Sequence, residues 1–147
     1  MKKLNRKGFT LIELLAVIVI LAIIMVVTIP AILTSIGNNR QKMFETSADT
    51  VAKWFEDQYG LAQLGDPGVS TVFTGFCGDT GSGCYTRKTL TADVLNAAGV
   101  KSSNYVLANS NVTLNSDTSR ACVTLKANTS GGDFRAITDD EDSSSGC

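Results

Sequence analysis

Residues 8–33, GFTLIELLAVIVILAIIMVVTIPAIL, decide the fold of this chain. From Leu14 to Leu33 only Thr28 and Pro30 are not plainly apolar, and a helix of about 20 such residues crosses a hydrocarbon core of about 30 Å. The residues before this stretch include four cations, Lys2, Lys3, Arg6 and Lys7. Because basic flanks stay on the cytoplasmic side of a membrane, we expect one spanning helix with the rest of the chain outside.

One charged residue, Glu13, lies near the start of this apolar helix. A carboxylate inside a membrane costs a few kcal/mol, so its presence predicts a function and a partner. A secretory signal peptide or a plain membrane anchor is the simpler interpretation, but neither explains Glu13. The apolar run is also longer than the roughly 7 to 15 residues of a cleavable signal and lacks an A-x-A-like site behind it, whereas the small residue Gly8 precedes it.

Residues 7–31, KGFTLIELLAVIVILAIIMVVTIPA, resemble the N-terminal signal of the type IV pilin family. The resemblance implies that a prepilin peptidase cleaves between Gly8 and Phe9, which makes residues 1–8 a leader, and that the new Phe9 amine is methylated. It also implies that Glu13 faces the Phe9 amine of a neighbouring subunit, where opposite charge offsets the cost of burial. The same-chain alternative is that Glu13 caps the N-terminus of its own helix.

The resemblance further implies how residues 9–36 are used. This segment is expected to be a membrane helix in the subunit pool of the cytoplasmic membrane and the core of an extracellular helical homo-oligomer afterwards. An inner-membrane assembly platform would be a further partner. Pro30 removes one helical hydrogen bond, so a kink or local unwinding is expected there. The resemblance implies that residues 22–30 extend in the filament, and a plain kink is the alternative.

Beyond Gly37 apolar residues recur at three- and four-residue spacing, which predicts an amphipathic helix to about residue 62. We expect residues 37–147 to form a globular head outside the membrane. Residues 63–89 are predicted to be a connecting loop because they are rich in Gly, Ser, Thr and Asp. Thr91 as N-cap and Gly99 as a stop predict a short helix over 91–98.

Alternating apolar runs between turn residues predict an antiparallel sheet of three or four strands over 103–138, followed by an acidic C-terminal loop. The runs are NYVLAN, NVTLN, RACVTLKAN and DFRAI. The expected fold class is therefore α+β, with a long N-terminal helix packed on a small antiparallel sheet. The head of a type IV pilin has this layout.

The chain has four cysteines, all of them after the apolar helix. Outside the cytoplasm disulfides are more common than metal ligation, and four cysteines allow three pairings. We favour Cys77 with Cys84, which are separated by turn formers, and Cys122 with Cys147, which resembles the C-terminal disulfide loop of many pilins. A structural zinc ion held by all four thiolates is the alternative.

The C-terminal residues contain an acidic run, Asp139, Asp140, Glu141 and Asp142. Some pseudopilins of type II secretion hold calcium in a C-terminal loop, and clustered carboxylates suit a hard cation. This makes the run a weak calcium candidate, and a solvated acidic loop is the alternative. We expect no other cofactor.

The composition argues against catalysis and against binding of nucleic acid. The chain has no histidine, no Gly-rich phosphate loop after a strand and no metal-ligand spacing, so we expect no catalytic residues and no enzyme. Without residues 1–8 it keeps nine basic against 14 acidic residues, a net charge of −5, which is unsuited to a phosphate backbone.

Three interpretations of function follow from the resemblance. The leading one is a major pilin, the structural subunit of a type IV pilus used for adhesion, motility or aggregation. A pseudopilin of a type II secretion or competence system is the alternative, because it would share the N-terminal helix. A minor pilin at the filament tip is the third.

Overall fold

The structure is a computed structural model that describes residues 9–128 and 135–138. The chain divides into two compact units, Met1–Asn39 and Arg40–Cys147. A single helix, α1 (Leu11–Gln63), contributes to both units. Each unit is described by itself below, and the expected α+β class with its long N-terminal helix is confirmed.

The N-terminal unit consists of the first half of α1, whose side chains are exposed. Every residue from Phe9 to Ile36 is exposed, including a long series of large aliphatic side chains. Its two threonines beyond the first turn are satisfied within the helix, since the Thr28 hydroxyl donates to the carbonyl of Ile24 at 3.0 Å and the Thr34 hydroxyl donates to the carbonyl of Pro30 at 3.2 Å. This half of α1 therefore presents an almost wholly apolar surface.

The helix continues through Pro30 without a break. Proline removes one backbone donor, but the turns on both sides keep their own hydrogen bonds, so a single proline does not end a helix of this length. Of the kink or local unwinding that we expected at Pro30, the unwinding is absent from this structure. Unwinding in an assembled filament stays a prediction.

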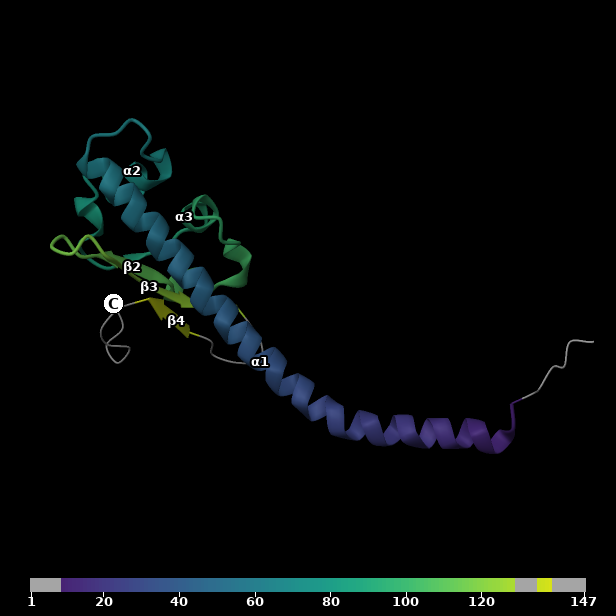
Figure 1. Ribbon diagram of the computed structural model, residues 1–147. Coiled ribbons are helices and arrows are strands. Elements are labelled where there is room, and N and C mark those ends of the chain that lie inside the picture. The colour runs from purple at the N-terminus through teal and green to yellow at the C-terminus, as the bar shows by residue number, and fades with distance from the viewer. Residues whose placement is uncertain (1–8, 129–134, 139–147) are drawn as a thin grey trace, which may run out of the picture. The chain divides into compact units, whose positions relative to one another are not determined.

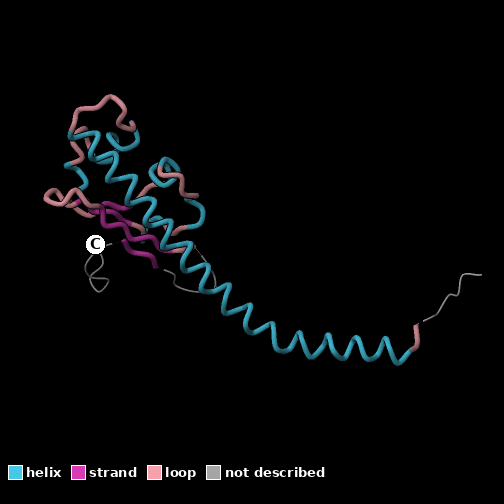
Figure 2. The backbone as a smooth tube through the Cα atoms, viewed as in Figure 1, coloured by secondary structure: helices cyan, strands magenta, loops and turns pink. Residues whose placement is uncertain are grey.

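The second unit is a small sheet packed against the second half of α1 (Figures 1 and 2). The sheet has four antiparallel strands in the order β1-β2-β3-β4, namely Lys88–Thr89, Asn111–Leu114, Ala121–Lys126 and Arg135–Thr138. Its register sets Val112 beside Val123, and both side chains are fully buried. The helix and the sheet thus share one hydrophobic core.

The buried stripe of α1 follows the spacing seen in the sequence. Its members are Phe44, Ala48, Val51, Ala52, Phe55, Tyr59 and Ala62. Phe55 is fully buried, and its ring centre lies 6.1 Å from that of Phe73 and 6.0 Å from that of Phe76. A long-range hydrogen bond of 3.0 Å from the Ala121 amide to the Glu56 carboxylate also ties β3 to α1.

The predicted loop over residues 63–89 is wrong in its middle part, which contains the helix α2 (Thr71–Cys77). Ser70 is the N-cap, and its hydroxyl accepts from the amide of Val72 at 3.3 Å. Phe73 and Cys77 then fall on one helical face, and both are buried. The Ser70 cap and this short apolar spacing were overlooked among the surrounding glycines and threonines.

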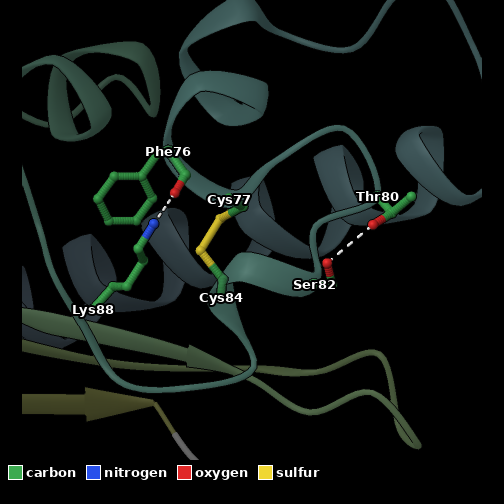
Figure 3. Close-up of a disulfide and its surroundings, with 6 residues drawn as sticks. All are labelled: Phe76, Cys77, Thr80, Ser82, Cys84 and Lys88. Atoms are coloured by element: carbon green, nitrogen blue, oxygen red, sulfur yellow. Dashed lines mark hydrogen bonds between the residues drawn. A yellow bond between two sulfur atoms is a disulfide. The ribbon is translucent and has the colours of Figure 1, made fainter.

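A disulfide between Cys77 and Cys84 follows α2, as predicted (Figure 3). It closes a ring that includes the 3-10 turn η1 (Ser82–Cys84). Lys88 holds α2 next to the disulfide loop. Its ammonium donates to the carbonyl of Phe76 and lies 4.8 Å from the centre of the Phe76 side-chain ring. Gly81 has a φ of +74°, and a Cβ there would lie 2.6 Å from the Tyr59 ring, so this position requires glycine.

The second predicted disulfide is only partly within the described residues. Cys122 on β3 is disulfide-bonded. Cys147, the partner that we expected, lies outside the described residues. The pairing of Cys122 with Cys147 therefore stays a prediction.

The helix α3 (Ala92–Ala97) begins after its N-cap Thr91, as expected. NYVLAN, in contrast, is not a strand. It forms the 3-10 turns η2 (Ser102–Asn104) and η3 (Leu107–Asn109), and touches the sheet only through a bridge between Tyr105 and Ala127. The two-residue strand β1 takes the edge position instead. The hydroxyl of the fully buried Ser110 donates to the carbonyl of Val106 at 2.9 Å in the turn before β2.

Replacing Phe55 by alanine is expected to lower the free energy of unfolding of the head by about 3 to 5 kcal/mol, since a fully buried ring leaves a cavity. Urea unfolding of the full chain in detergent, followed by Trp54 fluorescence, measures the loss. Leu64→Ala is the matched control because this leucine is 82% exposed, and its change should stay within about 0.5 kcal/mol. Equal losses in the two variants would contradict the assigned core.

Candidate functional site

The predicted site residues lie at the start of α1 and at Pro30. Gly8, on one side of the predicted cleavage point, is outside the described residues. Phe9, on the other side, is 88% exposed. Glu13 lies in the first turn of α1. The structure therefore brings the Phe9, Thr10 and Glu13 part of the motif together at one helix end.

Thr10 and Glu13 form a reciprocal pair at this helix end. The backbone amide and the hydroxyl of Thr10 both donate to Oε2 of Glu13, each at 2.9 Å. The amide of Glu13 in turn lies 3.3 Å from the Thr10 hydroxyl oxygen, which accepts from it. This is a capping box, in which the side chains of Thr10 and Glu13 each accept from the other residue's backbone amide, and the Glu13 amide also donates to the Thr10 carbonyl at 3.1 Å.

The capping box lowers the cost of placing Glu13 in an apolar environment. Its charge is shared with two donors of its own chain, and it stands at the positive end of the helix dipole. The structure thus shows the same-chain role that we gave as an alternative. The capping box uses only Oε2 of Glu13. Among the residues that the structure describes, no group donates to Oε1.

Thr10 is the site residue that the sequence reasoning overlooked. The motif T-L-I-E was noted as part of the signal, yet its spacing is also that of a capping box, with threonine three residues before glutamate. That spacing was sufficient to predict the contact. A carboxylate held by its own helix has one face occupied and one face open to a cation from outside the chain.

The apolar half of α1 is the second component of the site. The helix is long and apolar enough to cross a membrane, and none of its most apolar window is buried inside the chain. A surface of this size is far larger than the apolar patches of ordinary soluble monomers, and it marks a lipid or protein contact. The open oxygen of Glu13 therefore belongs to a half-helix whose apolar surface must contact lipid or another protein.

No metal centre is found in the part of the chain that the structure covers. The described residues contain no group of three or more acidic, cysteine or histidine side chains that could hold an ion. The weak calcium candidate, Asp139 to Asp142, lies outside the described residues and stays a prediction.

Residues 3–29 match the family model for the prokaryotic N-terminal methylation motif. This match supports a type IV pilin-like chain, a class that includes both pilins and pseudopilins, and it implies processing by a prepilin peptidase. It fits a precursor held in the membrane that is later assembled outside. Neither the curated proteins nor the solved structures give a match to this chain.

Replacing Thr10 by valine is expected to open the first turn of α1, because both side-chain contacts to Glu13 depend on the hydroxyl or on the cap geometry. Loss of an N-cap costs about 1 kcal/mol, so hydrogen exchange of the Glu13 amide in detergent micelles should become about fivefold faster. Thr10→Ser retains the hydroxyl and is the control. Unchanged exchange in the valine variant would contradict the capping box.

Proposed function

We propose that this protein is the major structural subunit of an extracellular type IV filament. One observation carries the proposal: the apolar half of α1 is exposed along its whole length, whereas the head has a complete core of its own. The head therefore needs no help from this half of the helix. The apolar half of α1 must therefore be buried in lipid before assembly and against other copies of itself afterwards.

A symmetric pair of these helices would cover only one face of each, so covering a helix that is apolar on all sides also requires contacts between different faces. Such a contact does not close into a ring and produces an open helical fibre. Transfer of apolar side chains from lipid to a bundle of identical helices leaves them in an apolar environment throughout. Assembly therefore gains little hydrophobic free energy. Polar contacts then decide how neighbouring helices are arranged.

Glu13 is the polar group that fixes this arrangement in the proposal. Once the chain is cleaved between Gly8 and Phe9, the open oxygen of Glu13 accepts a hydrogen bond from the cationic Phe9 amine of a neighbouring copy. A charge pair in an apolar environment is strongly distance-dependent, so only one axial offset between helices satisfies both charges. The capping box helps because it holds the carboxylate in one orientation before the neighbour arrives.

The pseudopilin alternative shares all of these features and differs in the size and place of the assembly. A pseudopilin forms a short piston within the cell envelope, whereas a major pilin is abundant in filaments outside the cell. The proposal is for a structural rather than a catalytic role in either case. Abundance in released filaments is therefore the property that separates the two.

Shearing filaments from the cells that make this protein, followed by mass spectrometry, tests the proposal. The expected result is an abundant chain that begins at methylated Phe9 with its cysteines oxidised. A Phe9 N-terminus found only in membranes would indicate a pseudopilin instead. An intact Met1 start would overturn both interpretations.

The variant Glu13→Gln tests the role of the charge. It should be cleaved normally and remain in the membrane, while its recovery in sheared filaments falls about tenfold or more, as expected for loss of about 1.4 kcal/mol or more per contact. Glu45→Gln is the control, since it makes the same chemical change on the head, where Glu45 accepts only from Gln41 at 3.0 Å. Equal recovery of the two variants would remove Glu13 from the assembly mechanism.

A further inference from the structure

We propose that copies of the head also join directly, by inserting the turn at residues 64–67 of one copy into an open pocket beside α1 of another. We call this turn the knuckle. The proposal rests on the proposed function, because a filament is what brings the two surfaces together. It adds a second, specific contact to the helix core.

The knuckle is a rigid projection at the end of α1. The amide of Asp66 donates to the carbonyl of Leu61 at 3.0 Å and the amide of Gly65 donates to that of Ala62 at 3.2 Å, which is the Schellman pattern, with Gly65 at a φ of +65°. Asp66 Oδ1 also accepts from the Gly68 amide at 2.7 Å. The turn is thus held in one shape while its side chains face solvent.

Leu64 is the apolar tip of the knuckle. It is 82% exposed, more than any other large apolar side chain in the described part of the Arg40–Cys147 unit. Every other large aliphatic side chain that is as exposed belongs to the first half of α1. A lone exposed leucine is ordinary, but one presented on a fixed turn beside a carboxylate is suited to a pocket of matching character.

The pocket lies between the first head turns of α1 and the segment after α3. Met43 and Ser47 line one side of it, and Val100, Lys101 and Tyr105 line the other. Its volume is about 370 Å³, enough to receive a leucine side chain and its flanking turn. Val100 and Tyr105 are buried, whereas Met43 is 53% exposed, so these three side chains give the pocket an apolar part. The rest is lined by the hydroxyl and amide side chains of Thr46, Ser47, Thr50 and Asn104.

The charges of the two surfaces are complementary. Among the described residues that line the pocket only Lys101 is charged, and its ammonium has no hydrogen-bond or ion-pair partner in the described part of the chain. Tyr105 stays neutral, because burial raises the pKa of its phenol. Asp66 uses one carboxylate oxygen within its own turn, which leaves the other for Lys101 of the next copy.

A copy cannot fill its own pocket. Ser47 lines the pocket, and the 17-residue step from Ser47 to Leu64 along α1 covers about 25 Å at 1.5 Å per residue. The knuckle and the pocket are therefore two different surfaces on one head. Joining them between copies gives a contact that propagates along a fibre and does not close.

A photocrosslinking residue, benzoylphenylalanine, placed at position 64 of the full chain tests the contact directly. In filaments sheared after illumination we expect crosslinked dimers whose adducts map to Met43–Thr50 or Gly99–Tyr105 of a second copy. The same residue at position 85 is the control, because Tyr85 is also partly exposed but lies off the knuckle. Adducts from position 64 that map elsewhere, or a probe at position 43 that captures a different protein, overturn the proposal.

Charge reversal tests the Asp66 and Lys101 pair. Asp66→Lys and Lys101→Asp are each expected to lower filament recovery by about fivefold, the upper range for an exposed pair. The double reversal should restore recovery to within about twofold. Asp117→Lys, on the exposed turn between β2 and β3, is the control for adding a lysine to the head and should have no effect.

The outcomes separate this proposal from the proposed function. If the wild-type chain forms filaments and the double reversal lowers filament recovery by the product of the two single reductions, the knuckle contact is overturned. The proposed function as a filament subunit then still stands. A wild-type chain that is cleaved at Phe9 but never found in filaments overturns both. Rescue by the double reversal, together with adducts in the pocket, supports the contact.

Discussion

The absence of any cover for the first half of α1 is the constraint on which the rest of the structure depends. An apolar helix surface that the chain does not bury must lie in lipid or against another protein. The head answers a separate requirement, since it has its own core around Phe55 and the β2 and β3 strands. The first half of α1 is therefore stabilised by what surrounds the chain, and the second half by packing inside the head.

Polar groups in the apolar half illustrate the same constraint. Glu13 bonds to Thr10, and the hydroxyls of Thr28 and Thr34 bond to carbonyls one turn earlier. These four polar side chains find partners within the helix, which lowers the cost of keeping the segment in a membrane. Glu13 keeps one oxygen, Oε1, that accepts from no group among the described residues. A carboxylate oxygen without a partner in an apolar segment is where a cationic group is expected to bind.

Sequence patterns predicted the elements that carry a clear periodicity, cap or turn signal, and missed α2 and the edge of the sheet. The helix to about residue 62, the short helix after Thr91 and the Cys77–Cys84 bond follow from apolar spacing, a cap and turn residues. α2 was missed because its cap, Ser70, stands among glycines and threonines that are typical of a loop. NYVLAN alternates like a strand, but the edge of the sheet is decided by long-range pairing with Val112, which no local pattern reveals. At the site, Glu13 was recognised while its contact with Thr10 was overlooked.

The continuity of α1 has a mechanical consequence. α1 is one helix from Leu11 to Gln63, and it contributes residues to both units. In a fibre, tension applied to the heads would reach the core through this one helix. The weakest link along it is the turn at Pro30, where a backbone donor is missing. A filament made of such subunits would lengthen first at that turn, while the disulfide-braced heads keep their shape.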